Sequence, residues 1–361
     1  MTSLRTSGTC RIVGAGLLGT SIGLALTKAG LDVVIEDATP TNARLAIDYG
    51  AGRKASESDG PSIVIVCVPP DVTASVVAAE LERFPNAVVT DVASVKSSIL
   101  QDLTARGADL SRYLGSHPMA GRERGGALSG RADLFIARPW VLAVHDSASA
   151  RAVTAVEDLA LDLGAIPSRM SPEAHDRAVA LVSHAPQVVS SLLAARLANA
   201  EASEVALAGQ GLRDTTRIAA SDPKLWLQIL GANADSVRTV LTGFQDDLAS
   251  VISALEDTDA SGALAVIGDA LAAGNRGVEK IPGKHGSNAT AYSFVVVLID
   301  DKPGQLAKLL TEVGEAGINL EDLKLEHSPG AAVGLVELAV LPAVEQKLVA
   351  ELTSRGWRLA G

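Results

Sequence analysis

The first part of the chain alternates short apolar runs with stretches in which apolar residues recur at helical spacing. We expect a strand at each apolar run, at residues 9–14, 33–35, 63–68, 87–90 and 140–144. We expect helices between them, at residues 20–29, 43–49, 72–82 and 95–105, and a helix–strand pair near 153–166 that adds an edge strand. This alternation is typical of a parallel, doubly wound sheet, and it predicts an α/β domain over residues 1–170.

The pattern changes after Ser171, where Ala- and Leu-rich helical periodicity replaces the strands. The apolar spacing predicts helices at residues 174–200, 204–207, 225–254 and 261–275. We therefore expect an all-α domain over residues 171–280. Long Ala-rich helices pack closely, often against a second copy of the chain, so we expect a homodimer formed through this region.

A third pattern follows a short linker. Residues 281–291 contain Gly, Pro, Lys and Ser, which is typical of a linker. In residues 292–361 the apolar spacing predicts elements in the order strand, helix, strand, strand, helix, strand. This βαββαβ order predicts a small ferredoxin-like domain at the C-terminal end.

Composition narrows the class of protein. A length of 361 residues suits two or three domains, and 47% hydrophobic residues exclude a disordered chain. With 3% aromatic residues and a formal charge of −11, nucleic acid is an unfavourable partner. The longest apolar run, residues 63–68, is far shorter than the roughly 20 residues of a membrane helix.

The cysteines and the N-terminal residues bear on location. Cys10 and Cys67 fall on separate strands, so we expect both to be reduced. The first ten residues lack an apolar signal core, and Cys and His form no metal-ligand cluster. We expect a cytoplasmic protein with neither a metal site nor a membrane partner.

A glycine motif lies between the first strand and the first helix. Gly14 allows a tight turn, Gly16 lets a pyrophosphate approach the backbone, and Gly19 lets the helix pack on the strand. The intervening Leu17 and Leu18 place backbone amides at the helix start, where phosphate binds. The motif predicts a Rossmann-type dinucleotide site; the alternative is a Gly-rich turn that binds no ligand.

The end of the second predicted strand bears on the choice of cofactor. Asp37 can accept both ribose hydroxyls and would repel a 2′-phosphate, so we favour NAD over NADP. Glu36 is the rival for that role, because strand alternation cannot turn both carboxylates toward the ribose. Val68 and Pro69 end a further strand at the sheet edge where the nicotinamide should lie, although Pro69 would serve equally as a strand terminator.

The best candidate for proton transfer is His117. It lies in Ser116-His117-Pro118, which we place on a loop at the same sheet edge, and a neutral imidazole can take a proton at pH 7. Ser94 could hold a substrate hydroxyl or fix the imidazole. Taken alone, His117 would be a structural residue; its position favours a general base.

The helical region adds further polar candidates. His184 lies at a kink caused by Pro186, and kinks at polar residues often line pockets. Arg213 and Arg217, four residues apart, could share one face and bind a carboxylate, or form ordinary surface or a pair with Asp214.

Three further residues receive structural roles. We expect His175 and Asp176 to cap and orient a neighbouring helix. Asp222, followed by Pro223, predicts a helix start.

Motifs along nearly the whole chain resemble the prephenate/arogenate dehydrogenase family of tyrosine biosynthesis. They are, in order, GAGLLGTSIGLAL, TDVASVK, SHPMAGRERGGA, RPWVL, HDRAVALVSHAP and GLRDTTRIAASDPKLW. The C-terminal stretch DDKPGQLAKLLTEVGEAGINLEDL resembles an ACT domain, a sensor module that often binds amino acids.

The resemblance implies roles for individual residues. His117 matches a catalytic histidine in H-P-[IM]-A-G, and Ser94 matches the serine of S-V-K that positions it. Arg217 matches the arginine of T-R-I-A that binds a substrate carboxylate. His184 matches the first histidine of S-H-x-P-H, and Gln187 stands where many members have the second. That substitution leaves the choice between prephenate and arogenate open.

The implied activity is NAD-dependent oxidative decarboxylation of prephenate to 4-hydroxyphenylpyruvate and CO2. An arogenate dehydrogenase, which forms tyrosine directly, is the alternative within the family. An amino-acid-sensing, nucleotide-binding protein without turnover is a hypothesis from another class. Arg122 and Glu123, just past the His117 motif, could also face the substrate side chain.

For the C-terminal domain, the resemblance implies two loops suited to backbone capture of an amino-acid effector, with tyrosine or phenylalanine as candidates. The alternative is a module that only dimerises. The loop residues are Asp301, Pro303, Gly304, Gln305, Gly317 and Asn319.

Overall fold

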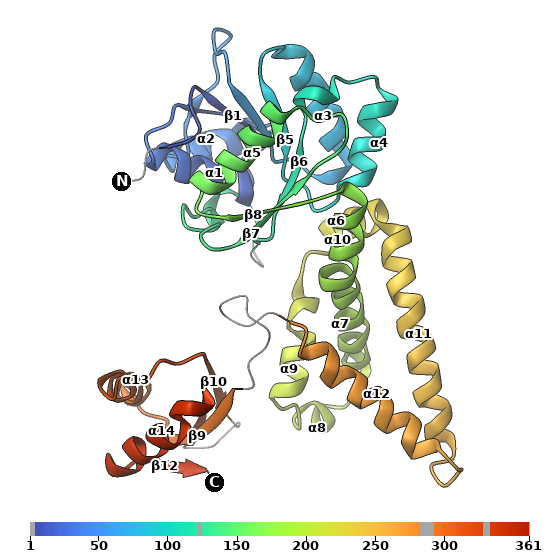
Figure 1. Ribbon diagram of the computed structural model, residues 1–361, viewed down its shortest axis with the longest axis vertical. Coiled ribbons are helices and arrows are strands. Elements are labelled where there is room, and N and C mark those ends of the chain that lie inside the picture. The colour runs from blue at the N-terminus through green and yellow to red at the C-terminus, as the bar shows by residue number, and fades with distance from the viewer. Residues whose placement is uncertain (1–3, 122–124, 282–291, 328–332, 361) are drawn as a thin grey trace. The chain divides into compact units, whose positions relative to one another are not determined.

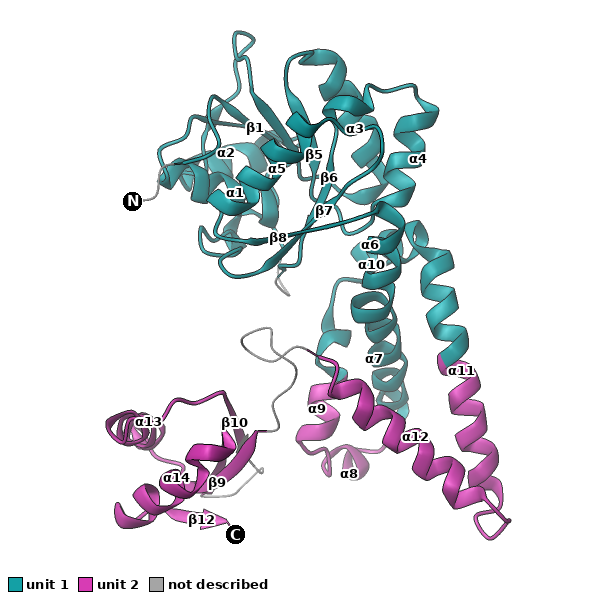
Figure 2. Cartoon of the chain, in the orientation of Figure 1, with its two compact units in different colours: residues 1–199, 216–243 teal, residues 200–215, 244–361 magenta. Residues whose placement is uncertain are grey.

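The computed structural model describes residues 4–121, 125–281, 292–327 and 333–360 (Figure 1). The chain divides into two compact units (Figure 2). Unit 1 comprises residues 1–199 and 216–243, and unit 2 comprises residues 200–215 and 244–361. Arg122 and Glu123, and residues 282–291 of the expected linker, lie outside the described residues.

Unit 1 is built on a five-stranded parallel sheet with the order β3-β2-β1-β4-β5. The strands are β1 (Cys10–Val13), β2 (Val33–Glu36), β3 (Arg53–Lys54), β4 (Ile63–Val66) and β5 (Val88–Asp91). The intervening helices are α1 (Leu17–Lys28), α2 (Pro40–Asp48), α3 (Pro70–Arg83) and α4 (Ser97–Ala105). The predicted parallel α/β alternation is therefore confirmed for this part of the chain.

The central strand β4 shows how the core is organised. All four of its residues are buried, because helices cover both faces of the sheet. Ile63 and Ile65 join the apolar cluster under α1, α2 and α5 (Ala150–Asp162). Val64 and Val66 join the cluster under α3 and α4. Ile-Val-Ile-Val thus fits a strand that has no polar face.

The sequence prediction was wrong about the strands after residue 110. The predicted strand at 140–144 and the helix–strand pair near 153–166 do not extend the parallel sheet. They form a separate three-stranded sheet, β6-β7-β8, made of β6 (Gly115–Pro118), β7 (Pro139–Ala143) and β8 (Ile166–Met170). A single bridge between Val89 and Tyr113 connects it to β5. Beyond that bridge β6 does not pair with β5, and it pairs antiparallel with β7 instead, so these strands do not continue the parallel ladder.

Residues 171–280 contain helices and no strand, as predicted. The helices are α6 (Pro172–Val179), α7 (Ala185–Arg196), α8 (Ala202–Val205), α9 (Gln210–Thr216), α10 (Pro223–Ala232), α11 (Ala234–Glu256) and α12 (Ala263–Val278). The helix start at Asp222 and Pro223 is confirmed, because the Asp222 carboxylate accepts the amide of Lys224 at 2.9 Å. The single helix predicted over 225–254 is wrong, since it breaks at Asn233.

Two features mark the run from α6 to α7. A five-residue π-turn, Ala180–His184, connects the helices and absorbs the break that Pro186 would otherwise cause. The run Pro172–Asn199 is 28 residues long and has a mean hydropathy of 1.5 in its most apolar window, so by length and composition alone it could cross a membrane. Its polar residues His175 and Asp176 are buried inside unit 1, whereas most of that window is exposed in a single copy.

Residues 293–360 of unit 2 have the element order β-α-β-β-α-β. The elements are β9 (Ser293–Asp300), α13 (Gln305–Glu315), β10 (Asp322–His327), β11 (Val333–Val340), α14 (Pro342–Ser354) and β12 (Arg358–Ala360). The sheet order is β10-β11-β9-β12, and its strands pair antiparallel. Val297, Leu309 and Leu348 are among the buried residues that join the sheet to its two helices.

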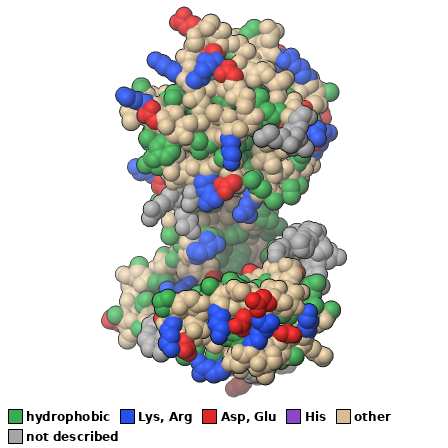
Figure 3. Space-filling view, turned by 90° about the vertical axis from the view of Figure 1, so that its left-hand side faces the viewer, with side chains coloured by type: hydrophobic (Ala, Val, Ile, Leu, Met, Phe, Trp, Pro, Cys, Tyr) green, Lys and Arg blue, Asp and Glu red, His purple; other side chains and the backbone are tan. Residues whose placement is uncertain are grey.

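Acidic and basic side chains are interspersed on the face of the molecule drawn in Figure 3. They do not gather there into a patch of one sign.

Candidate active site

The glycine loop between β1 and α1 has almost no room for side chains. Gly14 has a φ of +107°, and a Cβ there would overlap the carbonyl group of Cys67. A Cβ on Gly19 would overlap the carbonyl oxygen of Gly14. Gly16, in contrast, faces open space. Two of the glycines therefore serve backbone packing, and the third leaves the loop open to a ligand.

The first turn of α1 begins at this open position. Gly16 is the N-cap residue, no side chain caps the helix, and its first turn contains no acidic residue. The amides at the start of α1, where Leu17 and Leu18 lie, are thus available to an anion. Val68 lies 3.2 Å from where a Cβ on Gly14 would be, and Pro69 is the N-cap residue of α3.

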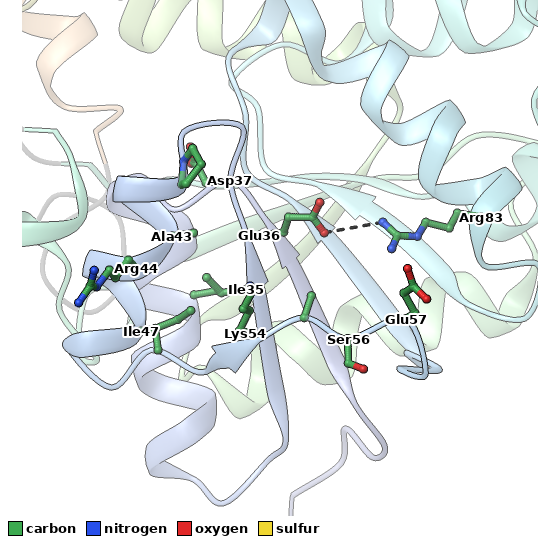
Figure 4. A pocket seen from close by; sticks show the side chains of 12 residues that line it. Ile35, Glu36, Asp37, Ala43, Arg44, Ile47, Lys54, Ser56, Glu57 and Arg83 are labelled. Atoms are coloured by element: carbon green, nitrogen blue, oxygen red, sulfur yellow. Dashed lines mark ion pairs between the residues drawn. The ribbon is translucent and has the colours of Figure 1, made fainter.

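A cavity of about 680 Å³ lies beside the end of β2 (Figure 4). Asp37 accepts the amides of Ala15 and Thr39, at 2.7 and 2.8 Å, so its carboxylate is fixed at the glycine loop. Glu36 points the other way, toward Arg83, and also pairs with Arg11. As strand alternation predicted, the two carboxylates do not point the same way.

His117 occupies the third position of β6, so the prediction that it lies on a loop was wrong. It pairs in register with Val141 of β7. The neighbouring Ser116 hydroxyl donates to the carbonyl of Asp91 at 2.9 Å, which ties β6 to the carboxyl end of β5. Strand pairing therefore fixes the imidazole at the sheet edge where the sequence placed it.

The hydrogen-bond partner of His117 is a second histidine. His117 Nδ1 lies 2.8 Å from His175 Nε2, and the rings meet edge to face with centroids 5.1 Å apart. Among the residues that the structure describes, Ser94 makes no hydrogen bond to His117, so the predicted positioning by Ser94 is not seen here. Ser94 is half-buried in the segment between β5 and α4.

Asp176 anchors the other side of His175. Its Oδ1 lies 2.8 Å from His175 Nδ1 and accepts the amide of Lys96 at 2.9 Å. Its Oδ2 accepts the amide of Ser97 at 2.8 Å. The carboxylate therefore caps α4, as expected, and also holds His175.

The electrostatics keep His117 neutral. Burial lowers its pKa well below the usual value, and the positive charges that His175 and Lys96 carry when protonated lower it further. Lys96 is itself buried and forms an ion pair with the buried Asp91. The Tyr113 hydroxyl donates to the same carboxylate at 2.7 Å.

We call His117, His175, Asp176 and Lys96 the polar cluster. His184 ends the π-turn that follows α6, and Gln187 lies one turn further on, in α7. His184 is 1% exposed, and burial lowers its pKa to about 4. Its Nδ1 lies 3.2 Å from the side-chain amide of Asn233, which also donates to the backbone of Asp176 at 2.8 Å. Gln187 is buried and contacts Ser221.

The two arginines are separated by a change of helix type. Arg217 begins the 3₁₀ turn Arg217–Ala220, which packs against α7 in unit 1. Arg213 lies in α9, in unit 2. Their predicted common face is not supported, because the α-helical register ends between them. The approach of Arg217 to His117 stays a prediction.

Sequence reasoning missed two polar contacts of this site. His175 was assigned only a structural role, although its adjacency to Asp176 in a segment of the family resemblance was a usable signal. Asn233 was hidden inside a predicted continuous helix. Both contacts join residues at least 49 positions apart, which local periodicity cannot reveal.

The two candidate effector loops lie at opposite ends of α13. Asp301, Pro303 and Gly304 precede the helix, which begins at Gln305, and Gly317 and Asn319 follow it. A helix of 11 residues is about 16 Å long, so one amino acid cannot bind both loops of a single copy.

A dehydrogenase needs a site for a dinucleotide and a group that accepts a proton. In unit 1 the glycine loop before α1 can hold the dinucleotide, and the neutral His117 can accept the proton. These features define an NAD-dependent oxidoreductase with a Rossmann-like domain and a helical domain. Residues 22–167 match the family model "Prephenate dehydrogenase, nucleotide-binding domain", and residues 171–268 match "Prephenate dehydrogenase, dimerization domain". The chain belongs to the prephenate dehydrogenase family.

Individual relatives agree with this assignment. The probable prephenate dehydrogenase NovF of Streptomyces niveus is 35% identical, over 97% of this chain and 98% of the relative. The cyclohexadienyl dehydrogenase of Zymomonas mobilis is 29% identical, over 69% of this chain and 88% of the relative. The structure of A. aeolicus prephenate dehydrogenase with hydroxyphenyl propionate and NAD+ is 25% identical and has a TM-score of 0.67 over 76% of this chain and 99% of that one.

Proposed function

We propose that this protein oxidises and decarboxylates prephenate with NAD, giving 4-hydroxyphenylpyruvate and CO2. The observation that carries the proposal is the neutral, half-buried His117 on the same unit as an open dinucleotide loop. The family assignment and the NovF relative, which matches nearly the full length of the chain, support prephenate as the substrate.

The chemistry requires little more than positioning and one proton acceptor. NAD, when bound, would supply the acceptor for the hydride that leaves C4 of the substrate. His117 takes the proton of the C4 hydroxyl, which makes the loss of hydride easier. As the C1 carboxylate leaves as CO2, its bonding electrons enter the ring, and the phenolic oxygen regains the proton from His117. The ring becomes aromatic, so the step is effectively irreversible.

The remaining candidates would orient the substrate. We assign Arg217 to a substrate carboxylate, since a guanidinium binds that group with two parallel hydrogen bonds. His184 and Gln187 both present neutral polar groups. The low pKa of His184 keeps its imidazole uncharged at pH 7, and the side-chain amide of Gln187 carries no charge. We assign both to the polar side chain of the substrate, and Ser94 to its hydroxyl.

The test is a spectrophotometric assay that crosses prephenate and arogenate with NAD and NADP. We expect NADH formation with prephenate and NAD, with the highest kcat/KM of the four combinations. A higher kcat/KM with arogenate would identify an arogenate dehydrogenase. No reduced cofactor from either substrate would favour a sensor without turnover.

We also propose that residues 292–361 form an ACT-type regulatory domain that binds an aromatic amino acid. The βαββαβ order and its single antiparallel sheet support this. Calorimetry of the full chain with tyrosine and with phenylalanine, compared with a chain that ends at residue 281, tests it. Heat of binding in both chains, or in neither, would favour a module that only dimerises.

The helical region supports the expected homodimer. Leu181, Val182 and Leu192 of the α6–α7 run are each more than 60% exposed in a single copy. Such an apolar face is suited to burial against a second copy, and residues 171–268 match the family's dimerization domain. We retain the domain boundaries at residues 170, 280 and 291, and we propose a cytoplasmic location because both cysteines are free.

A further inference from the structure

Three side chains form a buried hydrogen-bonded chain that ends at the base. Asp176 Oδ1 lies 2.8 Å from His175 Nδ1, and His175 Nε2 lies 2.8 Å from His117 Nδ1. His175 is 0% exposed and Asp176 is 3% exposed. These hydrogen bonds run from α6 to β6, so they join the helical region to the β6-β7-β8 sheet within unit 1.

The positions of the protons in this row of hydrogen bonds follow from Asp176, at its buried end. Two backbone amides, of Lys96 and Ser97, donate to the Asp176 carboxylate. Burial alone would raise the pKa of Asp176, but the hydrogen bonds from His175 and Ser97 outweigh burial and lower it. An ionised carboxylate only accepts, so His175 Nδ1 carries the proton that is donated to it.

The same reasoning extends one step further. A neutral imidazole protonated at Nδ1 has a lone pair at Nε2. With its single proton on Nδ1, His175 accepts at Nε2, and among the described residues the hydrogen-bond partner of that atom is His117 Nδ1, which then donates. Neutral His117 then carries its proton on Nδ1 and a free lone pair on Nε2.

We propose that Asp176, acting through His175, is a positioning residue that fixes the tautomer of His117 and so makes Nε2 the atom that accepts the substrate proton. The inference rests on the proposed function for the identity of that proton. His117 Nε2 has no hydrogen-bond partner among the residues that the structure describes, so it is left for the substrate. When Nε2 takes the hydroxyl proton, the imidazolium stays hydrogen-bonded to His175, and its proton returns to the phenolic oxygen after CO2 leaves.

The first test is Asp176→Asn. The Asn side chain can keep one backbone amide bond through its oxygen, but its NH2 group would donate to His175 Nδ1. His175 would then donate from Nε2, and His117 would be protonated on Nε2, the wrong atom. We expect kcat with prephenate to fall on the order of 10²–10⁴-fold while NAD affinity is retained. Asp109→Asn, at the exposed start of a 3₁₀ turn, is the matched control and should leave kcat unchanged.

The tautomer can be observed without turnover. In ¹⁵N-histidine-labelled protein, which has six histidines, we expect the His117 signals to show a protonated Nδ1 and a bare Nε2. Asp176→Asn should invert them. A protonated Nε2 in the unmodified protein would overturn the proposal, as would Asp176→Asn with unchanged kcat.

A second pair of variants covers the case in which Asp176→Asn does not fold. His175→Gln retains an oxygen that can accept from His117 Nδ1, whereas His175→Leu offers no acceptor. We expect Gln to retain at least tenfold more kcat than Leu, with both chains binding NAD. Equal kcat in the two variants would overturn the proposal. If the unmodified protein converts neither substrate, the proposed function fails, and the ¹⁵N signals still decide the tautomer.

Discussion

A single imidazole can act as a base at neutral pH only if it remains unprotonated and in place. His117 meets both conditions, because burial lowers its pKa and strand pairing in β6 fixes its backbone. His175 orients the ring from the other side. At the residue scale, the site is therefore the His117 side chain, whose orientation is fixed by β6 on one side and by His175 on the other.

His117→Asn should remove the proton acceptor and preserve the cofactor site. We expect kcat to fall on the order of 10²–10⁴-fold. The dissociation constant for NAD should change less than threefold, because the glycine loop and Asp37 lie on other segments. Steady-state kinetics and calorimetric titration with NAD measure the two quantities.

The matched control is His145→Asn. His145 is also half-buried and hydrogen-bonded, to the carbonyl of Tyr113, but it is not part of the cluster. It should retain kcat. If His117→Asn kept near-normal turnover, His117 would have no role in proton transfer.

At the scale of single helices and strands, the functional groups lie where an element begins or ends. The carboxyl end of β1 leads into a loop where Gly14 and Gly19 pack backbone against backbone, while Gly16 stays open. The break between α10 and α11 turns Asn233 into the cluster. In each case a helix or strand boundary, rather than its middle, carries the functional group.

Two glycine substitutions separate packing from binding. Gly19→Ala should destabilise the protein by several kcal/mol, because its methyl group meets the Gly14 carbonyl oxygen and α1 must shift. Gly16→Ala should leave the unfolding midpoint nearly unchanged but weaken NAD binding about tenfold or more, since its methyl group enters the open space of the loop. Denaturant unfolding and NAD titration of both variants check this; equal stability losses would contradict it.

The sequence predicts elements better than it predicts their pairing. The apolar run at 63–68 and the glycine motif are local patterns, and both led to the right elements. His117 was misplaced on a loop because Pro118 suggests a strand end, whereas pairing with β7 extends the strand. His175 was missed because its contact with His117 spans 58 residues, and no pattern within one segment encodes that distance.

For the molecule as a whole, the buried polar cluster links stability to pH. The folded protein keeps His184 neutral, with a pKa of about 4, whereas an unfolded chain would titrate it near 6.5. Between these values the unfolded state binds the proton and the folded state does not. Stability is therefore fully present above pH 6.5 and is lost as the pH falls toward 4.

Folding stability should thus fall by up to about 3 kcal/mol between pH 7 and pH 4 on account of His184 alone. The lowered pKa of His117 acts in the same direction. Urea midpoints measured across this range test the expectation. His184→Asn should flatten the pH dependence, and an unmodified protein with a constant midpoint from pH 7 to 5 would contradict it.

The π-turn at Ala180–His184 acts as a spacer in the winding of the α6–α7 run. Ordinary α-helix winding advances about 100° per residue. Deleting exposed Val182 should therefore relax the bulge into regular helix and rotate one half of the run by about that angle against the other. Asp176 precedes the bulge and Gln187 follows it, so the shortened chain should keep its helix content by circular dichroism and lose turnover. The length of this run, set by the five-residue turn, therefore constrains the site separately from the apolar residues that fill it.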